Sequence, residues 1–126
     1  MCHTKKSEFF GNLMEYKEFS EQVEATLYNG SGRRIAILPD IFGLTDFYRG
    51  YASYIANFGA DVFLVNPWAE FGGPRDISRD AAYERRAKIK DKEYCDHLEL
   101  FLAEQNIDAV VGFCLGGNFA LELARR

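Results

Sequence analysis

The sequence lacks any cluster of positive charge. It has 15 lysine and arginine residues against 19 aspartate and glutamate residues, which gives a formal net charge of −4. No more than two arginines are adjacent in the sequence, and such pairs occur at residues 33–34, 85–86 and 125–126. A protein that binds the phosphate backbone of a nucleic acid needs a basic stripe or patch. We therefore expect no nucleic-acid partner.

Long apolar runs are also missing. No stretch approaches the roughly 18 apolar residues that a membrane-spanning helix needs, and the N-terminus has no apolar segment of the kind found in secretory signals. The three cysteines, Cys2, Cys95 and Cys114, are an odd number and show no metal-ligand spacing. Free thiols are typical of a reducing compartment. We expect a cytoplasmic protein with no membrane partner and no metal.

What the sequence does have is the composition of a globular protein. Its 126 residues are 48% hydrophobic and 27% charged, values that are ordinary for a folded domain. The length is enough for one domain with a real core and too short for two ordinary ones. We therefore expect a single domain over residues 1–126, with residues 1–14 as an irregular lead-in because their patterning is weak.

Strand and helix signals alternate along the rest of the chain. Short apolar runs predict buried strands, and apolar residues at helical spacing predict helices. This alternation indicates an α/β fold with a parallel sheet. Residues 16–28 have the composition of strand, most clearly 23–28, and the other expected strands are 35–38, 62–65 and 108–113. The expected helices are 46–58 and 81–105, the second broken once, and residues 29–32 and 66–80 form a turn and a loop.

The segment 46–58 carries large apolar residues at helical spacing, which predicts a helix that Thr45 or Asp46 can cap. Gly59 stands where a helix commonly ends in a left-handed glycine. The five apolar residues at helical spacing are Phe47, Tyr51, Tyr54, Ile55 and Phe58.

A glycine-framed cysteine near the end of the sequence has the form of a nucleophile elbow, Gly-x-Cys-x-Gly, between a strand and a helix. Glycine at Gly112 and Gly116 lets the strand and the helix approach without a Cβ clash. The helix N-terminus favours the thiolate of Cys114, and the N–H of Leu115 would point at a developing oxyanion. The alternative is that Cys114 is a small buried core residue.

Two separated motifs together resemble one family. Residues 38–44, Leu-Pro-Asp-Ile-Phe-Gly-Leu, and residues 112–117, Gly-Phe-Cys-Leu-Gly-Gly, are similar to the dienelactone hydrolase family, an α/β-hydrolase group with a cysteine nucleophile. The resemblance covers about residues 20–126. It implies the front half of an α/β-hydrolase fold, a mainly parallel sheet with flanking helices that stops after the nucleophile elbow.

The resemblance also implies roles for individual residues. Cys114 would attack an ester or lactone carbonyl, and the N–H groups of Leu115 and Ile41 would form the oxyanion hole. Asp40 falls where the family commonly has a glutamate that partners the resting thiol. The alternative for Asp40 is an ordinary turn or cap aspartate.

A substrate site is implied further along the chain. Arg79 and Tyr83, four residues apart, resemble the pair that receives a substrate carboxylate. The alternative for both is a solvated helix face. Trp68, in the loop before them, is a candidate pocket wall. The resemblance implies no metal and no organic cofactor, and a small ester or lactone as the molecule bound.

The remaining members of a catalytic triad are missing from the sequence. In this fold the acid and the histidine follow the nucleophile, whereas only nine residues follow Gly117. His3 lies in the lead-in, and His97 lies in a helix expected beside the sheet. We expect the sequence to be the front portion of a longer hydrolase, with strand 108–113 left at a sheet edge where self-association could occur.

Three functions remain open at this point. The first is a cysteine hydrolase of small esters or lactones, working through an acyl-enzyme. The second is a glutamine amidotransferase-like enzyme, because those enzymes carry a similar cysteine elbow. The third is a non-catalytic half-fold that oligomerises through its open sheet edge.

Overall fold

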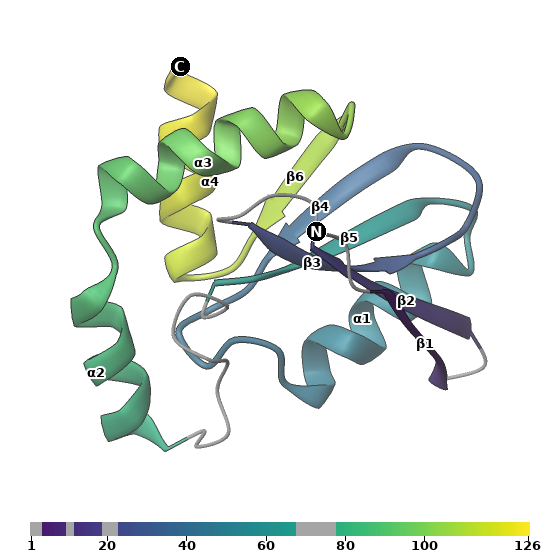
Figure 1. The fold of residues 1–126 in the computed structure, drawn as a ribbon, viewed down its shortest axis with the longest axis horizontal. Helices are drawn as coiled ribbons and strands as arrows, with labels where there is room; N and C mark the ends of the chain where they lie inside the picture. The colour runs from purple at the N-terminus through teal and green to yellow at the C-terminus, as the bar shows by residue number, and fades with distance from the viewer. Residues whose placement is uncertain (1–3, 10–11, 19–22, 68–77) are drawn as a thin grey trace.

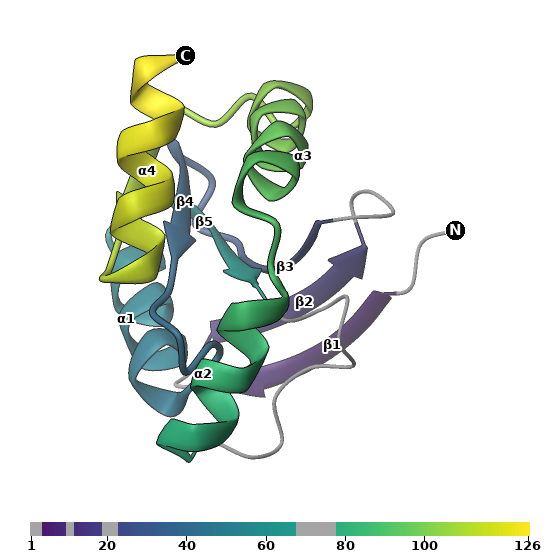
Figure 2. The same cartoon turned by 90° about the vertical axis from the view of Figure 1, so that its left-hand side faces the viewer.

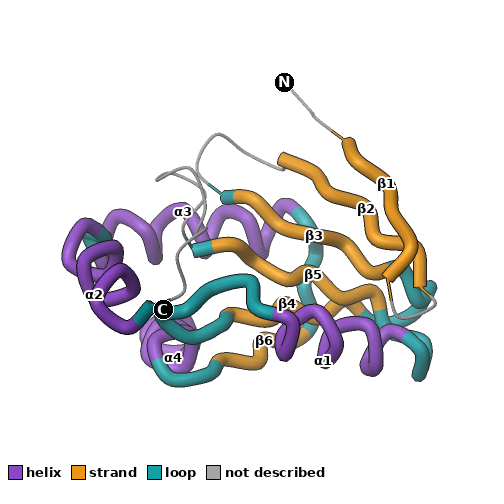
Figure 3. The backbone as a smooth tube through the Cα atoms, turned by 90° about the horizontal axis from the view of Figure 1, so that it is seen from below, coloured by secondary structure: helices purple, strands orange, loops and turns teal. Residues whose placement is uncertain are grey.

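A six-stranded sheet in the order β1-β2-β3-β5-β4-β6 forms the centre of the protein, with β1 at one edge and β6 at the other (Figure 3). The computed structural model describes residues 4–9, 12–18, 23–67 and 78–126. The strands are β1 (Thr4–Phe9), β2 (Asn12–Glu18), β3 (Glu24–Tyr28), β4 (Arg34–Leu38), β5 (Asp61–Asn66) and β6 (Ala109–Gly112).

The sheet is mixed. Strands β5, β4 and β6 run parallel, whereas β1, β2 and β3 pair antiparallel with one another, and β3 pairs antiparallel with β5. In the described ranges, the helices that flank it are α1 (Asp46–Ala56), α2 (Arg79–Lys88), α3 (Asp91–Glu104) and α4 (Leu115–Arg125) (Figure 1). The predicted α/β class is confirmed, as is the single break between residues 81 and 105. The prediction of a mainly parallel sheet is wrong for the described strands, because β1, β2 and β3 add three antiparallel pairings.

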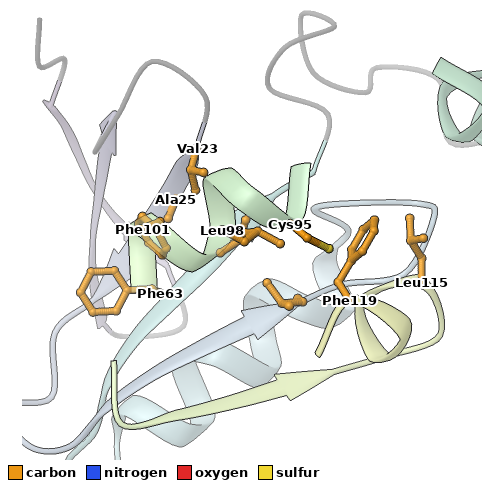
Figure 4. Packing of buried hydrophobic residues seen from close by; sticks show 10 residues of the cluster. Val23, Ala25, Phe63, Cys95, Leu98, Phe101, Leu115 and Phe119 are labelled. Atoms are coloured by element: carbon orange, nitrogen blue, oxygen red, sulfur yellow. The ribbon is translucent and has the colours of Figure 1, made fainter. Parts of the chain in front are cut away.

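The helices cover both faces of the sheet. On one face, α3 and α4 pack over a core that includes Phe63, Leu98 and Phe119 (Figure 4). On the other, α1 packs over Ile37 and Leu64, so that α1 and α3 lie on opposite sides of the central strands (Figure 2). Strands buried on both faces read as unbroken apolar runs, which is why β4 and β5 were predictable from the sequence.

The described parts of residues 1–14 do not form the irregular lead-in that was predicted. Residues 4–9 form β1 and residues 12–18 form β2, paired so that Phe9 lies opposite Asn12. Strand β2 in turn pairs with β3, Met14 opposite Tyr28. The edge of β3 offers unpaired backbone groups, and a hairpin that pairs with that edge is stabilised by backbone hydrogen bonds. Such pairing leaves little mark on local sequence pattern.

The apolar residues whose spacing predicted α1 do not form its buried side. Phe47, Tyr54 and Phe58 are 62%, 61% and 77% exposed, and Tyr51 and Ile55 are only half-buried. The residues facing the sheet are mostly small, which allows the helix axis to approach the strands closely. They are Tyr48, Ala52, Ser53 and Ala56. Apolar spacing therefore predicted the helix but not its orientation.

Strand β6 ends the sheet, as predicted for the strand around residues 108–113. It pairs with β4, and Ala109 is exposed. Within the described ranges no helix is long and apolar enough to cross a membrane.

Candidate active site

Cys114 lies on a strained turn between β6 and α4. Its backbone angles are φ 55° and ψ −110°, in a region that residues with a side chain rarely occupy. The side chain is exposed. A nucleophile elbow has this property, because a sharp turn from strand to helix presents the nucleophile at the end of the sheet. The predicted position of Cys114 on a strand-to-helix turn is confirmed, and the buried-core alternative is not.

The two framing glycines allow the elbow to pack against β4. A Cβ atom on Gly112 would collide with the carbonyl of Gly116, and one on Gly116 would collide with the carbonyl of Leu38. The N–H of Gly116 donates to the carbonyl oxygen of Pro39 (3.1 Å), and the N–H of Phe113 donates to that of Leu38 (3.0 Å). The start of α4 is therefore held directly against the end of β4.

Asp40 follows β4 in a tight turn at the same edge of the sheet. The N–H of Phe42 donates to Asp40 Oδ1 (2.9 Å), and the N–H of Gly43, with φ 79°, donates to the Asp40 carbonyl (3.1 Å). Leu38 pairs with Gly112 across β4 and β6. Asp40 and Cys114 each come two residues after this pair, so both lie beyond the carboxyl ends of neighbouring parallel strands.

Tyr48 is a site residue that sequence reasoning missed. It lies in the first turn of α1, is 3% exposed, and donates its hydroxyl to Asp40 Oδ2 (2.8 Å). Burial, followed by the hydrogen bond to Asp40, raises the pKa of Tyr48 far above its ordinary value, and the charge of Cys114 adds to the rise. The signal available in the sequence was a tyrosine eight residues after the motif aspartate. The apolar residues whose spacing predicted the helix did not include Tyr48.

The two predicted oxyanion donors lie on the loops after β4 and β6. Leu115 is the first residue of α4, and the first N–H groups of a helix have no acceptor within it. Ile41 is inside the Asp40–Gly43 turn. Both backbone groups therefore belong to the segments that meet at the Gly116–Pro39 hydrogen bond. Their role as donors to an oxyanion stays a prediction.

The predicted carboxylate-binding pair lies on α2. Arg79 and Tyr83 are both exposed, Tyr83 to 56%, and α2 lies beyond the edge of the sheet where β4 and β6 end (Figures 1 and 2). Within the described residues neither side chain has a hydrogen bond or ion pair, so both are available to a ligand or to solvent. Trp68 lies outside the described residues.

Comparison with protein families gives the assignment. The model of the dienelactone hydrolase family matches residues 23–126. This chain belongs to the dienelactone hydrolase family.

Two curated relatives in this family share much of the sequence. Carboxymethylenebutenolidase 2 of Cupriavidus pinatubonensis is 43% identical over 129 residues, an overlap that covers 100% of this chain and 55% of the relative. Carboxymethylenebutenolidase of Rhodococcus opacus is 40% identical over 103 residues, covering 79% of this chain and 41% of the relative. The chain thus spans about half the length of the relatives it matches.

Solved structures show the same fold. A dienelactone hydrolase candidate from Klebsiella pneumoniae superposes with a TM-score of 0.57 at 18% identity, covering 93% of this chain and 51% of that one. The structure named m3DLH gives 0.57 at 19% identity, with 99% and 54% covered. At these identities the likeness concerns the fold, and it confirms the α/β-hydrolase architecture.

Other ionisable residues of this dienelactone hydrolase family member lie apart from the elbow. His97 is on α3, where it lines a pocket at the α2–α3 junction together with Pro67, Lys88 and Tyr94. His3 lies outside the described residues. In the part of the chain that the structure describes, no group of three or more histidine, cysteine, aspartate or glutamate side chains could hold a metal ion.

Proposed function

We propose that this protein is a hydrolase of small esters or lactones that uses Cys114 as its nucleophile. The observation that carries the proposal is an exposed thiol on a strained elbow, packed directly against the end of β4 where Asp40 lies. Membership of the dienelactone hydrolase family supports this function over a glutamine amidotransferase-like one.

The chemistry would proceed in two steps. The Cys114 thiolate adds to the carbonyl carbon, the carbon–oxygen bond of the ester or lactone breaks, and the leaving alcohol oxygen takes up a proton. Water then hydrolyses the thioester, which releases the carboxylic acid and returns the thiol. The N–H groups of Leu115 and Ile41 would donate to the oxygen that becomes negative in each step.

The substrate would carry a carboxylate. The name carboxymethylenebutenolidase, borne by both relatives, denotes a lactone with such a group. Arg79 and Tyr83, exposed one helical turn apart on α2, are the side chains proposed to receive it, with Trp68 as a neighbouring wall.

General acid–base help is a separate requirement. A positioned histidine typically raises the reaction rate by about 10²–10⁴-fold. His97 does not serve as this base in the proposal, because it lines the pocket at the α2–α3 junction with Lys88 and Tyr94. We expect the triad acid and histidine from sequence outside these 126 residues, since the curated relatives are about twice as long. The 126-residue chain would then form the acyl-enzyme faster than it hydrolyses it.

Thiol alkylation with peptide mass spectrometry tests the nucleophile. Cys95 is a matched internal control, because it is 2% exposed and burial raises the pKa of its thiol. With iodoacetamide, Cys114 is expected to react at least about tenfold faster than Cys95. With 4-nitrophenyl acetate, an acetyl thioester is expected on Cys114. The Cys114→Ser variant is expected to show no thioester at this position. Equal alkylation rates with no adduct would contradict the proposal.

The edge position of β6 favours a second candidate function. An uncovered edge strand presents unpaired backbone groups to another chain, so a cytoplasmic protein that self-associates through β6 is the alternative. A concentration-dependent dimer with an unreactive Cys114, measured by sedimentation and alkylation on one sample, would favour it over the hydrolase.

A further inference from the structure

The hydroxyl of Tyr48 meets the carboxylate of Asp40 inside the protein. Tyr48 is 3% exposed, and its hydroxyl donates to Asp40 Oδ2 at 2.8 Å. The other carboxylate oxygen accepts the N–H of Phe42 at 2.9 Å. Each oxygen of Asp40 thus has one neutral donor, and within the described residues the carboxylate has no ion pair. The two donors fix the orientation of the carboxylate, and neither of them is a cation that would neutralise its charge.

Tyr48 also contacts the segment that carries the thiol. Its ring meets the ring of Phe113, the residue before Cys114, edge-on at 5.3 Å between centroids. Among the described residues, the charged groups that act on the Tyr48 phenol are Asp40, from the turn after β4, and Cys114, from the elbow. Asp40 and Cys114 therefore both act on Tyr48, and the loops that carry them lie side by side after the paired strands β4 and β6.

We propose that Tyr48 is a positioning residue that acts on Cys114 through Asp40. Its hydroxyl fixes the carboxylate and spreads part of its charge into a neutral hydrogen bond, so that a thiolate can form beside Asp40. The inference rests on the proposed function, since it concerns the same thiol. It adds a residue and a route to that function.

The physical reason lies in the balance of two negative groups. A carboxylate close to a thiol opposes thiolate formation by charge repulsion, and a hydrogen bond donated to the carboxylate weakens its field. Removing the Tyr48 hydroxyl leaves Asp40 with the Phe42 N–H as its donor. The thiolate then becomes less favourable. Removing the charge of Asp40 has the opposite effect.

The pH profile of Cys114 alkylation tests this route in four proteins: wild type, Tyr48→Phe, Asp40→Asn and the double variant. In Tyr48→Phe the midpoint of the profile is expected to move to higher pH, with alkylation at pH 7 slower by about 3- to 10-fold. In Asp40→Asn the midpoint is expected to move to lower pH. In the double variant, Tyr48→Phe is expected to change the alkylation rate by less than about twofold relative to Asp40→Asn alone, because the Asp40 charge through which it acts is absent.

Tyr51→Phe is the matched control. Tyr51 lies on the same helix and its ring also meets Phe113, at 5.5 Å, but its hydroxyl does not donate to Asp40. Its profile is expected to match that of wild type. A shift of the Tyr51→Phe profile equal to that of Tyr48→Phe would contradict the inference, because the effect would then not depend on the hydrogen bond to Asp40.

Two further results would overturn the inference. One is an unchanged profile in Tyr48→Phe, and the other is the same shift in the presence and absence of the Asp40 charge. If Tyr48→Phe fails to fold, Asp40→Asn alone decides, since an unchanged midpoint there removes the route. Failure of the proposed function looks different: wild-type Cys114 would then react no faster than Cys95.

Discussion

Two aspartates at opposite ends of the parallel strands show how similar hydrogen bonding can serve different ends. Asp61, at the amino end of β5, accepts the N–H groups of Gly30 (2.9 Å) and Ser31 (2.8 Å). Asp40, past the carboxyl end of β4, accepts the N–H of Phe42 and the hydroxyl of Tyr48. In both cases the carboxylate holds a turn in place.

A cation is present at one end. Arg34 donates to Asp61 Oδ2 (3.3 Å) and to the carbonyl of Gln105 (2.6 Å), and its guanidinium lies over the ring of Phe63 at 4.8 Å. The charge of Asp61 is thus neutralised by Arg34. The same hydrogen bonds join the turn before β4, the start of β5 and the residue after α3. At the other end Asp40 has only neutral donors. A neutralised carboxylate stabilises the fold, and one left charged beside a thiol can influence its chemistry.

The largest expected effect comes from breaking the backbone packing at the Cys114 end. In Gly116→Ala the new Cβ would collide with the carbonyl of Leu38, and neither backbone segment can move without disturbing the sheet. We expect the free energy of unfolding to fall by about 3 kcal/mol in a urea titration. Gly117→Ala is the control, because its Cβ would meet its nearest atom at an ordinary 3.5 Å. Equal losses in the two variants would contradict the close approach.

The next effect sharpens the contrast between the carboxylates. Asp61→Ala removes the acceptor of two backbone N–H groups and of Arg34 Nη1. We expect a loss of about 2 kcal/mol in urea, with Cys114 alkylation unchanged. Asp46→Ala is the control: its side chain is 90% exposed and 3.6 Å from Arg49, so the loss is expected to be about 0.5 kcal/mol or less. If Asp61→Ala slowed alkylation as Asp40 variants alter it, the two ends would not be independent.

The smallest effect distinguishes two buried tyrosines, Tyr48 on α1 and Tyr28 on β3. Tyr48 has a partner in Asp40, whereas the hydroxyl of Tyr28 has no hydrogen-bond partner among the described residues. Burial raises the pKa of Tyr28 from 10.0 to about 12, against a smaller opposite effect of Arg49. Replacing a buried, unpaired hydroxyl by hydrogen is expected to raise stability, so Tyr28→Phe should gain about 1 kcal/mol at pH 7.

The pH dependence of the same variant has a defined sign. The pKa of the Tyr28 phenol is 10.0 in the unfolded chain and about 12 in the folded protein. Below pH 10 the phenol is neutral in both states, and as the pH rises from 10 toward 12 its ionisation in the unfolded chain lowers the free energy of unfolding. Urea titrations from pH 8 to pH 11.5 should therefore show wild type losing stability above pH 10 and Tyr28→Phe losing less. Parallel curves for the two proteins would show that Tyr28 ionises normally.

Local chemistry in the sequence was enough to predict the elbow and the central strands. Cys114 lies on a turn that only small residues at positions 112 and 116 permit. In the structure a Cβ atom on Gly112 or Gly116 would collide with backbone atoms, as the sequence predicted. The apolar runs in β4 and β5 match strands buried on both faces. In these segments each residue's environment depends on its immediate neighbours or on burial alone, so short patterns suffice.

Other features depended on parts of the chain meeting in space. The hairpin of β1 and β2 forms because β3 offers it an edge, and the buried side of α1 follows the sheet surface beneath it rather than the helix's own aromatic residues. The Tyr48–Asp40 hydrogen bond joins a helix to the preceding turn, and no spacing rule specifies it. Pairing, helix orientation and the partner of a buried hydroxyl are properties of two surfaces in contact, and a linear pattern describes only one of them.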